Sequence, residues 1–132
     1  MGELMRVLLD THALLWWFTD DPRLSDLARR TIADETNEIV VSAASAWEIA
    51  TKQRLGKLNE AADAVFRFDE LVAADGFVHL PITHFHCLRA GSYTIEHRDP
   101  FDRMLAAQSE LESLPLVTCD PALALFDINT IW

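Results

Sequence analysis

The chain has 132 residues, of which 50% are hydrophobic and 24% are charged. These values are typical of a globular protein and exclude a disordered one, and the length allows a core without disulfides or a structural metal. The net charge of −10 argues against a broad surface that binds nucleic acid through its phosphates. The two cysteines, Cys87 and Cys119, form no zinc motif, so we expect a reduced protein in the cytoplasm.

Charged residues interrupt every apolar run, so the sequence predicts no membrane span. The N-terminal segment is too short for a signal-peptide core followed by a cleavage site. We expect one domain over residues 1–132, in which residues 1–4 are an extension if Met5 is the original initiator.

The first part of the chain predicts two strands, each followed by helical segments. Hydrophobic spacing and turn residues predict, in order, a buried strand at 5–9, an apolar segment packed on both sides at 11–18, a helix at 24–32, a β-branched strand at 38–42, a helix at 44–55 that stops near Gly56, and a helix at 61–74.

The second part continues this alternation. It predicts a strand at 77–80, a short helix at 83–90, a loop at 91–97, a helix from Pro100, a strand at 116–118, a helical turn or two at 121–126 and an edge strand at 128–132. Alternation at this spacing favours an α/β fold, with helices on both faces of a mostly parallel sheet.

Five carboxylates are predicted where strands pass into helices. They are Asp10, Glu48, Asp99, Asp102 and Asp120. In a parallel α/β sheet those turns lie together at the carboxyl edge, where ligands bind. Carboxylates gathered there repel one another and lose water, which a divalent cation offsets. An all-oxygen set suits Mg²⁺ or Mn²⁺, so the leading interpretation is a metal-dependent enzyme.

Helix capping is the alternative for each acid taken singly. Asp10, Asp99 and Asp120 each precede a helical pattern as an N-cap would. Ser45 and Glu48 have the spacing of a capping box, in which Glu48 reaches back to the Ser45 amide. Ser, Thr or Asn would cap equally well, so the repeated use of acids favours a metal site.

Four sequence blocks resemble the signature blocks of PIN-domain nucleases, and above all those of VapC-type toxins from toxin–antitoxin pairs. The blocks are residues 8–16, 41–50, 97–108 and 116–120, in the order of the family. The resemblance implies a three-layer α/β/α sandwich with an acidic Mg²⁺ or Mn²⁺ site that cleaves RNA. It also implies a homodimer and a cognate antitoxin, and the negative charge of this chain suggests that the antitoxin tail is basic.

The same resemblance assigns roles to the acids. Asp10, Asp102 and Asp120 match family positions expected to hold the metal directly or through water, and Glu48 matches the acid that helps to hold the metal or orients the attacking water. Asp99 either joins this set or only caps its helix. Thr118 is expected to orient Asp120 by a hydrogen bond.

Basic residues near the acids are candidates for contact with substrate phosphate. Arg98 is such a candidate together with His97, and Lys52 and Arg103 could form a modest basic rim. The alternative for the last two is an ordinary solvated face, on which Lys52 pairs with Glu48 four residues earlier.

Two other classes of function compete with the nuclease. One is a non-catalytic interaction module that keeps the fold and the helix caps. The other is a phosphoryl-transfer hydrolase with an aspartyl nucleophile, which would need an acid at the position of His12. The complete set of acids favours the nuclease over the first class, and His12 argues against the second.

Overall fold

The computed structural model describes residues 4–58 and 63–132, and its centre is a five-stranded sheet. The strands lie in the order β3-β2-β1-β4-β5, and all four neighbouring pairs are parallel. Their bounds are β1 Arg6–Leu9, β2 Glu38–Ser42, β3 Val78–Leu80, β4 Leu116–Val117 and β5 Thr130–Ile131. The predicted α/β class with a parallel sheet is confirmed.

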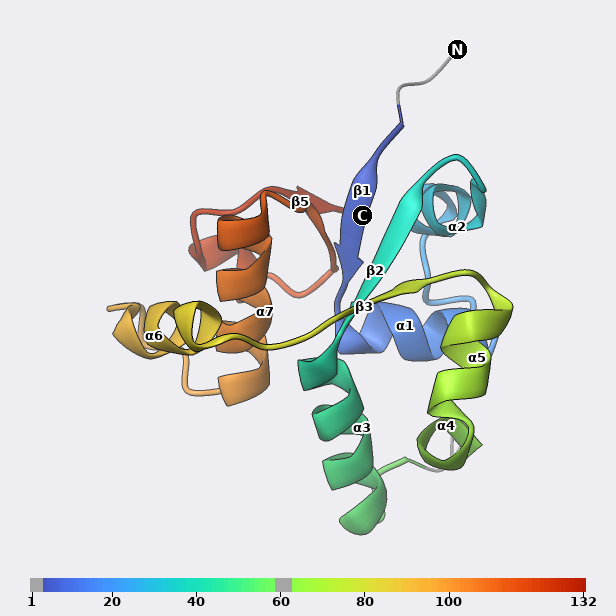
Figure 1. Cartoon of the computed structure of the whole chain (residues 1–132), viewed down its shortest axis with the longest axis horizontal. Coiled ribbons are helices and arrows are strands. Elements are labelled where there is room, and N and C mark those ends of the chain that lie inside the picture. The colour runs from blue at the N-terminus through green and yellow to red at the C-terminus, as the bar shows by residue number, and fades with distance from the viewer. Residues whose placement is uncertain (1–3, 59–62) are drawn as a thin grey trace.

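Helices cover both faces of this sheet (Figure 1). Their bounds are α1 Thr11–Phe18, α2 Asp26–Ala33, α3 Ala43–Arg54, α4 Asp63–Phe66, α5 Phe68–Ala74, α6 His84–Ser92 and α7 Pro100–Glu112, with a 3₁₀ turn at Leu123–Leu125. In Figure 1, α1, α2 and α5 lie on one side of the sheet and α6 and α7 on the other.

The apolar run of β1 explains this three-layer arrangement. Val7 and Leu9 belong to the core between the sheet and the α1–α2–α5 side, whereas Leu8 belongs to the core beneath α7. All three side chains are fully buried. A strand that is apolar on both faces needs a covering layer on each side, because successive side chains point to opposite faces.

The strand order places a topological switch point beside β1. The chain runs from β1 to β2 and β3 on one side and returns to β4 on the other side of β1. Ligands of open α/β sheets bind at the carboxyl ends of the strands at such a point. Asp10 directly follows β1, and Asp120 lies three residues after the end of β4.

Three segments differ from the sequence-based predictions. The helix expected at 61–74 is two helices, α4 and α5, which meet at Arg67, while residues 61 and 62 lie outside the described ranges. Helix α6 continues to Ser92, which shortens the following loop. The segment 11–18 is helix α1, which is not packed on both sides, because His12 is exposed and Trp16, Trp17 and Phe18 are partly exposed at the edge of the core.

The proposed extension at residues 1–4 falls almost entirely outside the described ranges. Within those ranges, no helix combines the length and the apolar character that crossing a membrane requires.

Candidate active site

Asp10 is a buried carboxylate at the carboxyl end of β1. Its Oδ1 atom accepts a hydrogen bond of 2.7 Å from the Ala13 amide and so caps α1, and only 4% of the residue is exposed. Burial raises the pKa of this carboxyl above its ordinary value, although hydrogen bonds from Thr118 and Ala13 act in the opposite direction. Asp10 is therefore both a helix cap and a desolvated acid.

Thr118 connects Asp10 to Asp120. Its side chain hydrogen-bonds to the Asp10 carboxylate, and its Oγ1 atom accepts the backbone amide of Asp120 at 3.1 Å. The Asp120 carboxylate accepts the Ala122 amide at 2.9 Å. The predicted hydrogen bond between Thr118 and Asp120 is therefore present, at the backbone amide of Asp120, and Thr118 also contacts the side chain of Asp10.

Asp99 and Asp102 open helix α7. The Oδ1 atom of Asp99 accepts the amides of Phe101 at 2.9 Å and Asp102 at 3.2 Å, which makes it the N-cap. The Asp102 Oδ2 atom lies 2.8 Å from Nε2 of His97. Asp99 therefore caps its helix, which is one of the two roles considered for it. His97 contacts the carboxylate of Asp102.

The prediction that these two acids follow a strand is wrong. Helix α6 intervenes between β3 and α7, so Asp99 and Asp102 follow a helix and a loop. They reach the same edge of the sheet for another reason. Helix α7 ends shortly before β4 begins, so its end lies at the edge of the sheet where β4 starts. The start of α7, with Asp99 and Asp102, therefore lies at the other edge, which is the carboxyl edge.

The predicted capping box at Ser45 is also wrong. Strand β2 passes into α3 without a loop, and Ser42 is the N-cap, with its Oγ atom 2.9 Å from the Ala44 amide. Ser45 already lies inside the helix, where its hydroxyl is 3.0 Å from Oγ1 of Thr11. This buried hydroxyl pair joins α3 to α1 beside Asp10.

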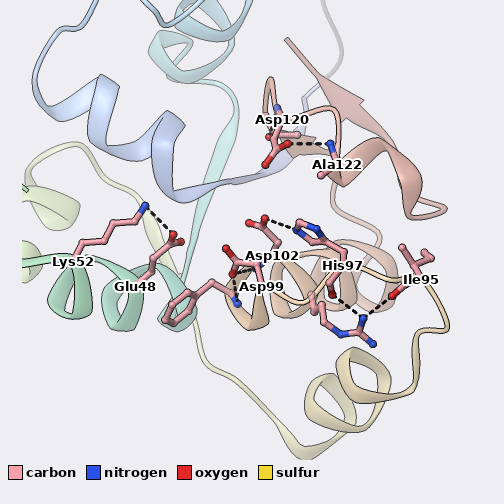
Figure 2. A network of polar contacts seen from close by, with 11 residues as sticks. Glu48, Lys52, Ile95, His97, Asp99, Asp102, Asp120 and Ala122 are labelled. Carbon is pink, nitrogen blue, oxygen red and sulfur yellow. Dashed lines mark hydrogen bonds and ion pairs between the residues drawn. The ribbon is translucent and has the colours of Figure 1, made fainter. Parts of the chain in front are cut away.

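Glu48 is free of the capping role and points toward the other acids. It is 6% exposed, and its Oε2 atom lies 2.9 Å from Nζ of Lys52. Figure 2 shows the carboxylates of Glu48, Asp99, Asp102 and Asp120 brought together from α3, α7 and the segment after β4.

Electrostatic interactions link these acids to one another. The pKa of Asp102 is raised, first by burial and then by the nearby negative charges of Asp99, Asp120 and Glu48, against the hydrogen bond from His97. Glu48 also raises the pKa of Asp10. The charges of Glu48, Asp99 and Asp120 therefore make ionisation of Asp102 less favourable, and the charge of Glu48 does the same for Asp10.

The donor set fits a hard divalent cation. Every potential ligand is a carboxylate oxygen, and Mg²⁺ or Mn²⁺ prefers a few carboxylates together with water. Within residues 4–58 and 63–132, no three His, Cys, Asp or Glu side chains are arranged to hold an ion directly. The repulsion that raises the pKa of Asp102 is nevertheless the kind that a cation among these acids would relieve.

The three basic candidates differ in their surroundings. Arg103 donates hydrogen bonds of 2.7–3.0 Å to the backbone carbonyls of Ala90, Tyr93, Ile95 and His97. This places Arg103 in a structural role, with little capacity left for phosphate. Lys52 pairs with Glu48, as the alternative interpretation held. Arg98 is exposed and makes no hydrogen bond or ion pair with the described part of the chain.

The sequence matches the PIN domain family model over residues 7–129. This chain belongs to the PIN domain family. The family membership confirms the resemblance seen in the sequence blocks, and no curated protein matches the sequence.

Two solved structures share the PIN fold of this chain. One is VapBC2 from Rickettsia felis, bound to a DNA fragment from their promoter, with 14% identity, a TM-score of 0.66, and 97% of this chain and 98% of that chain covered. The other is a toxin–antitoxin complex from Klebsiella pneumoniae, with 17% identity, a TM-score of 0.57 and 86% of each chain covered. At these identities, the similarity establishes the fold.

Sequence reasoning did not identify the Thr11–Ser45 hydroxyl pair or the pairing of His97 with Asp102. The first pair joins residues 34 positions apart, and no local motif in a single sequence indicates such a contact. The second had a weak signal, because His97 lies only five residues before Asp102.

Proposed function

We propose that this PIN domain is a metal-dependent endoribonuclease and the toxin of a toxin–antitoxin pair. The observation that carries the proposal is the group of Asp10, Glu48, Asp102 and Asp120 at the carboxyl edge of the sheet, where their charges oppose one another. The shared fold with chains from toxin–antitoxin complexes supports the biological setting.

In this proposal Asp10, Asp102 and Asp120 hold Mg²⁺ or Mn²⁺, directly or through water. When bound, the ion supplies Lewis-acid activation of the phosphodiester and of the attacking water. The chain supplies the orientation: Thr118 and the Ala13 amide hold the Asp10 carboxylate, and His97 holds that of Asp102. Glu48 helps to hold the ion or orients the attacking water, and Arg98 contacts a substrate phosphate.

The proposed partners follow from the charge of the chain and from the fold it shares. A net charge of −10 favours an antitoxin whose basic tail covers the acidic site. A homodimer in the cytoplasm is the expected state of the free toxin. These expectations can be tested separately from catalysis, by co-purification and by light scattering.

A non-catalytic PIN module is the second candidate, and two contacts within the chain favour it. Lys52 balances part of the charge of Glu48 by an ion pair, and His97 already occupies an oxygen of Asp102 by a hydrogen bond. A module of this kind would show no stabilisation by divalent ions and no loss of function when the acids are neutralised.

The decisive experiment incubates a mixed RNA pool with the parent protein, Asp10→Asn and the control Asp26→Asn, in Mg²⁺, Mn²⁺ or EDTA. Asp26 is an exposed acid in the first turn of α2, outside the acidic group. Cleavage that needs the metal, persists in Asp26→Asn and falls at least about a hundredfold in Asp10→Asn would support the nuclease. Equal cleavage by all three proteins would indicate a contaminant, and metal-independent cleavage would contradict the mechanism.

A further inference from the structure

Trp47 is an exposed aromatic side chain at the rim of the acidic site. It precedes Glu48 on α3 and is 58% exposed, whereas Glu48 is 6% exposed. Its ring centroid lies 4.6 Å from that of Phe101, with the ring planes at 78°. Phe101 precedes Asp102 on α7. The aromatic pair therefore spans α3 and α7 beside two of the carboxylates.

The other three tryptophans have structural explanations. Trp16, Trp17 and Trp132 are partly buried against the core on the α1 side of the sheet. Trp47 belongs to neither core cluster. Its edge-to-face contact with Phe101 restrains the ring before any ligand arrives, which lowers the entropic cost of binding on its open surface.

The charges around the site make an uncharged binding contact valuable. RNA phosphates approach a chain of net charge −10 and a group of carboxylates. Lys52 is paired with Glu48, and Arg103 donates to backbone carbonyls. Among the three predicted substrate contacts, only Arg98 is exposed and unpaired within the described residues. Stacking of a base on an aromatic ring adds affinity without a positive charge.

We propose that Trp47, supported by Phe101, is the stacking site for an unpaired base of single-stranded RNA next to the scissile phosphate. The proposal rests on the ribonuclease function proposed above and adds a substrate preference to it. Bases of a duplex are stacked on one another, so their faces are closed to the ring, whereas unstacked bases of single strands and loops are open to it.

The test measures binding in EDTA, so that it does not depend on cleavage. A fluorescently labelled single-stranded RNA oligomer and an abasic oligomer of equal length are titrated with the parent, Trp47→Leu and Trp47→Tyr. Phe85→Leu is the matched control, because Phe85 is a similarly exposed aromatic, 65%, on α6. Thermal unfolding of each variant verifies that it is folded.

We expect Trp47→Leu to bind the RNA about tenfold more weakly, while Trp47→Tyr and Phe85→Leu stay within about twofold of the parent. Phe101→Leu, which keeps Trp47 but removes its support, should fall between these values. The abasic oligomer should bind weakly, and equally, to the parent and to Trp47→Leu.

Equal RNA affinity of the parent and Trp47→Leu would overturn the stacking site. So would a parent that binds the abasic oligomer as tightly as the RNA oligomer, or a parent that does not bind the RNA at all. A separate cleavage assay distinguishes this failure from failure of the ribonuclease. If the parent cleaves RNA with Mg²⁺ and Trp47→Leu has an unchanged KM, the nuclease stands and the exposed pair is instead a protein-contact surface.

Discussion

The Nζ atom of Lys52 lies 2.9 Å from Oε2 of Glu48, one helical turn earlier on α3. The Glu48 side chain is 7% exposed and that of Lys52 is 26% exposed, so this pair is largely removed from water. The ammonium group brings a positive charge to a group of acids that repel one another. An internal cation thus partly balances the site, and a bound metal would add to this balance.

Replacing Lys52 by methionine should make the protein less stable and more dependent on metal. The variant leaves the Glu48 charge buried without its partner, which should cost roughly 1–3 kcal/mol in the free energy of unfolding in EDTA. Mg²⁺ should then raise the melting temperature of Lys52→Met more than that of the parent. Lys57→Met, at an exposed position beyond α3, is the control. An equal Mg²⁺ effect on all three proteins would contradict this account.

Asp10→Asn should stabilise the metal-free protein and remove its response to metal. Because burial raises the pKa of Asp10, its ionised form opposes folding once the pH exceeds the unfolded and then the folded value. A neutral amide removes that penalty, so the melting temperature in EDTA should rise by a few degrees, on the order of 2–6 °C. Calorimetry with and without Mg²⁺ measures both effects. A lower melting temperature in EDTA, with the Mg²⁺ increment retained, would refute the prediction.

Arg103→Lys should destabilise the loop that carries His97. An ammonium cannot reproduce a guanidinium that donates to the carbonyls of Ala90, Tyr93, Ile95 and His97. Loss of about three of these bonds should cost roughly 2–4 kcal/mol. Urea unfolding gives the total, and amide exchange over residues 93–97 locates it. Arg67→Lys, in an exposed pair with Glu70, is the control and should cost less than about 1 kcal/mol.

Glu110 should make stability depend on acid pH. Hydrogen bonds from Arg89 and then Tyr93 lower the pKa of Glu110 below its ordinary value of 4.5. At pH values above 4.5 the ionised Glu110 therefore stabilises the packing of α6 on α7. This contribution to the free energy of unfolding is lost as the pH falls through the lowered pKa of Glu110. Urea unfolding between about pH 3 and pH 6 should show the parent losing its advantage over Glu110→Gln as the pH falls. A constant difference across this range would show that the charge of Glu110 is not involved.

Local patterns in the sequence were sufficient for most of the secondary structure. Residues 38–42 form the predicted strand with identical bounds, because a β-branched run between polar turns is a strong local signal. Pro100 after Asp99 marked the start of α7 correctly, since both residues suit a helix N-terminus. The division of residues 61–74 into two helices was missed, because spacing alone does not reveal a break at Arg67.

The residues of the candidate site could also be predicted in part from the sequence. The acids could be named from the sequence because each lies in a local block with a recognisable pattern, and the structure brings the electrostatic neighbours Glu48, Asp99 and Asp120 around Asp102. The hydrogen-bond partners of individual side chains were predicted less well. Ser45 bonds to Thr11 instead of serving as a helix cap, and Arg103 holds a loop instead of facing solvent.

The sequence by itself determined the parallel α/β class, the PIN family and the candidate acids, because these depend on short-range patterns of hydrophobicity and motif. Only the tertiary structure decided that β4 lies beside β1, which brings the segments of Asp10 and Asp120 together through Thr118. It also decided that Arg103 donates to backbone carbonyls of the preceding loop, and that Trp47 contacts Phe101 at the rim of the site. The β1–β4 pairing and the Trp47–Phe101 contact join residues far apart in the chain, so their geometry arises only when both cores are packed around the sheet.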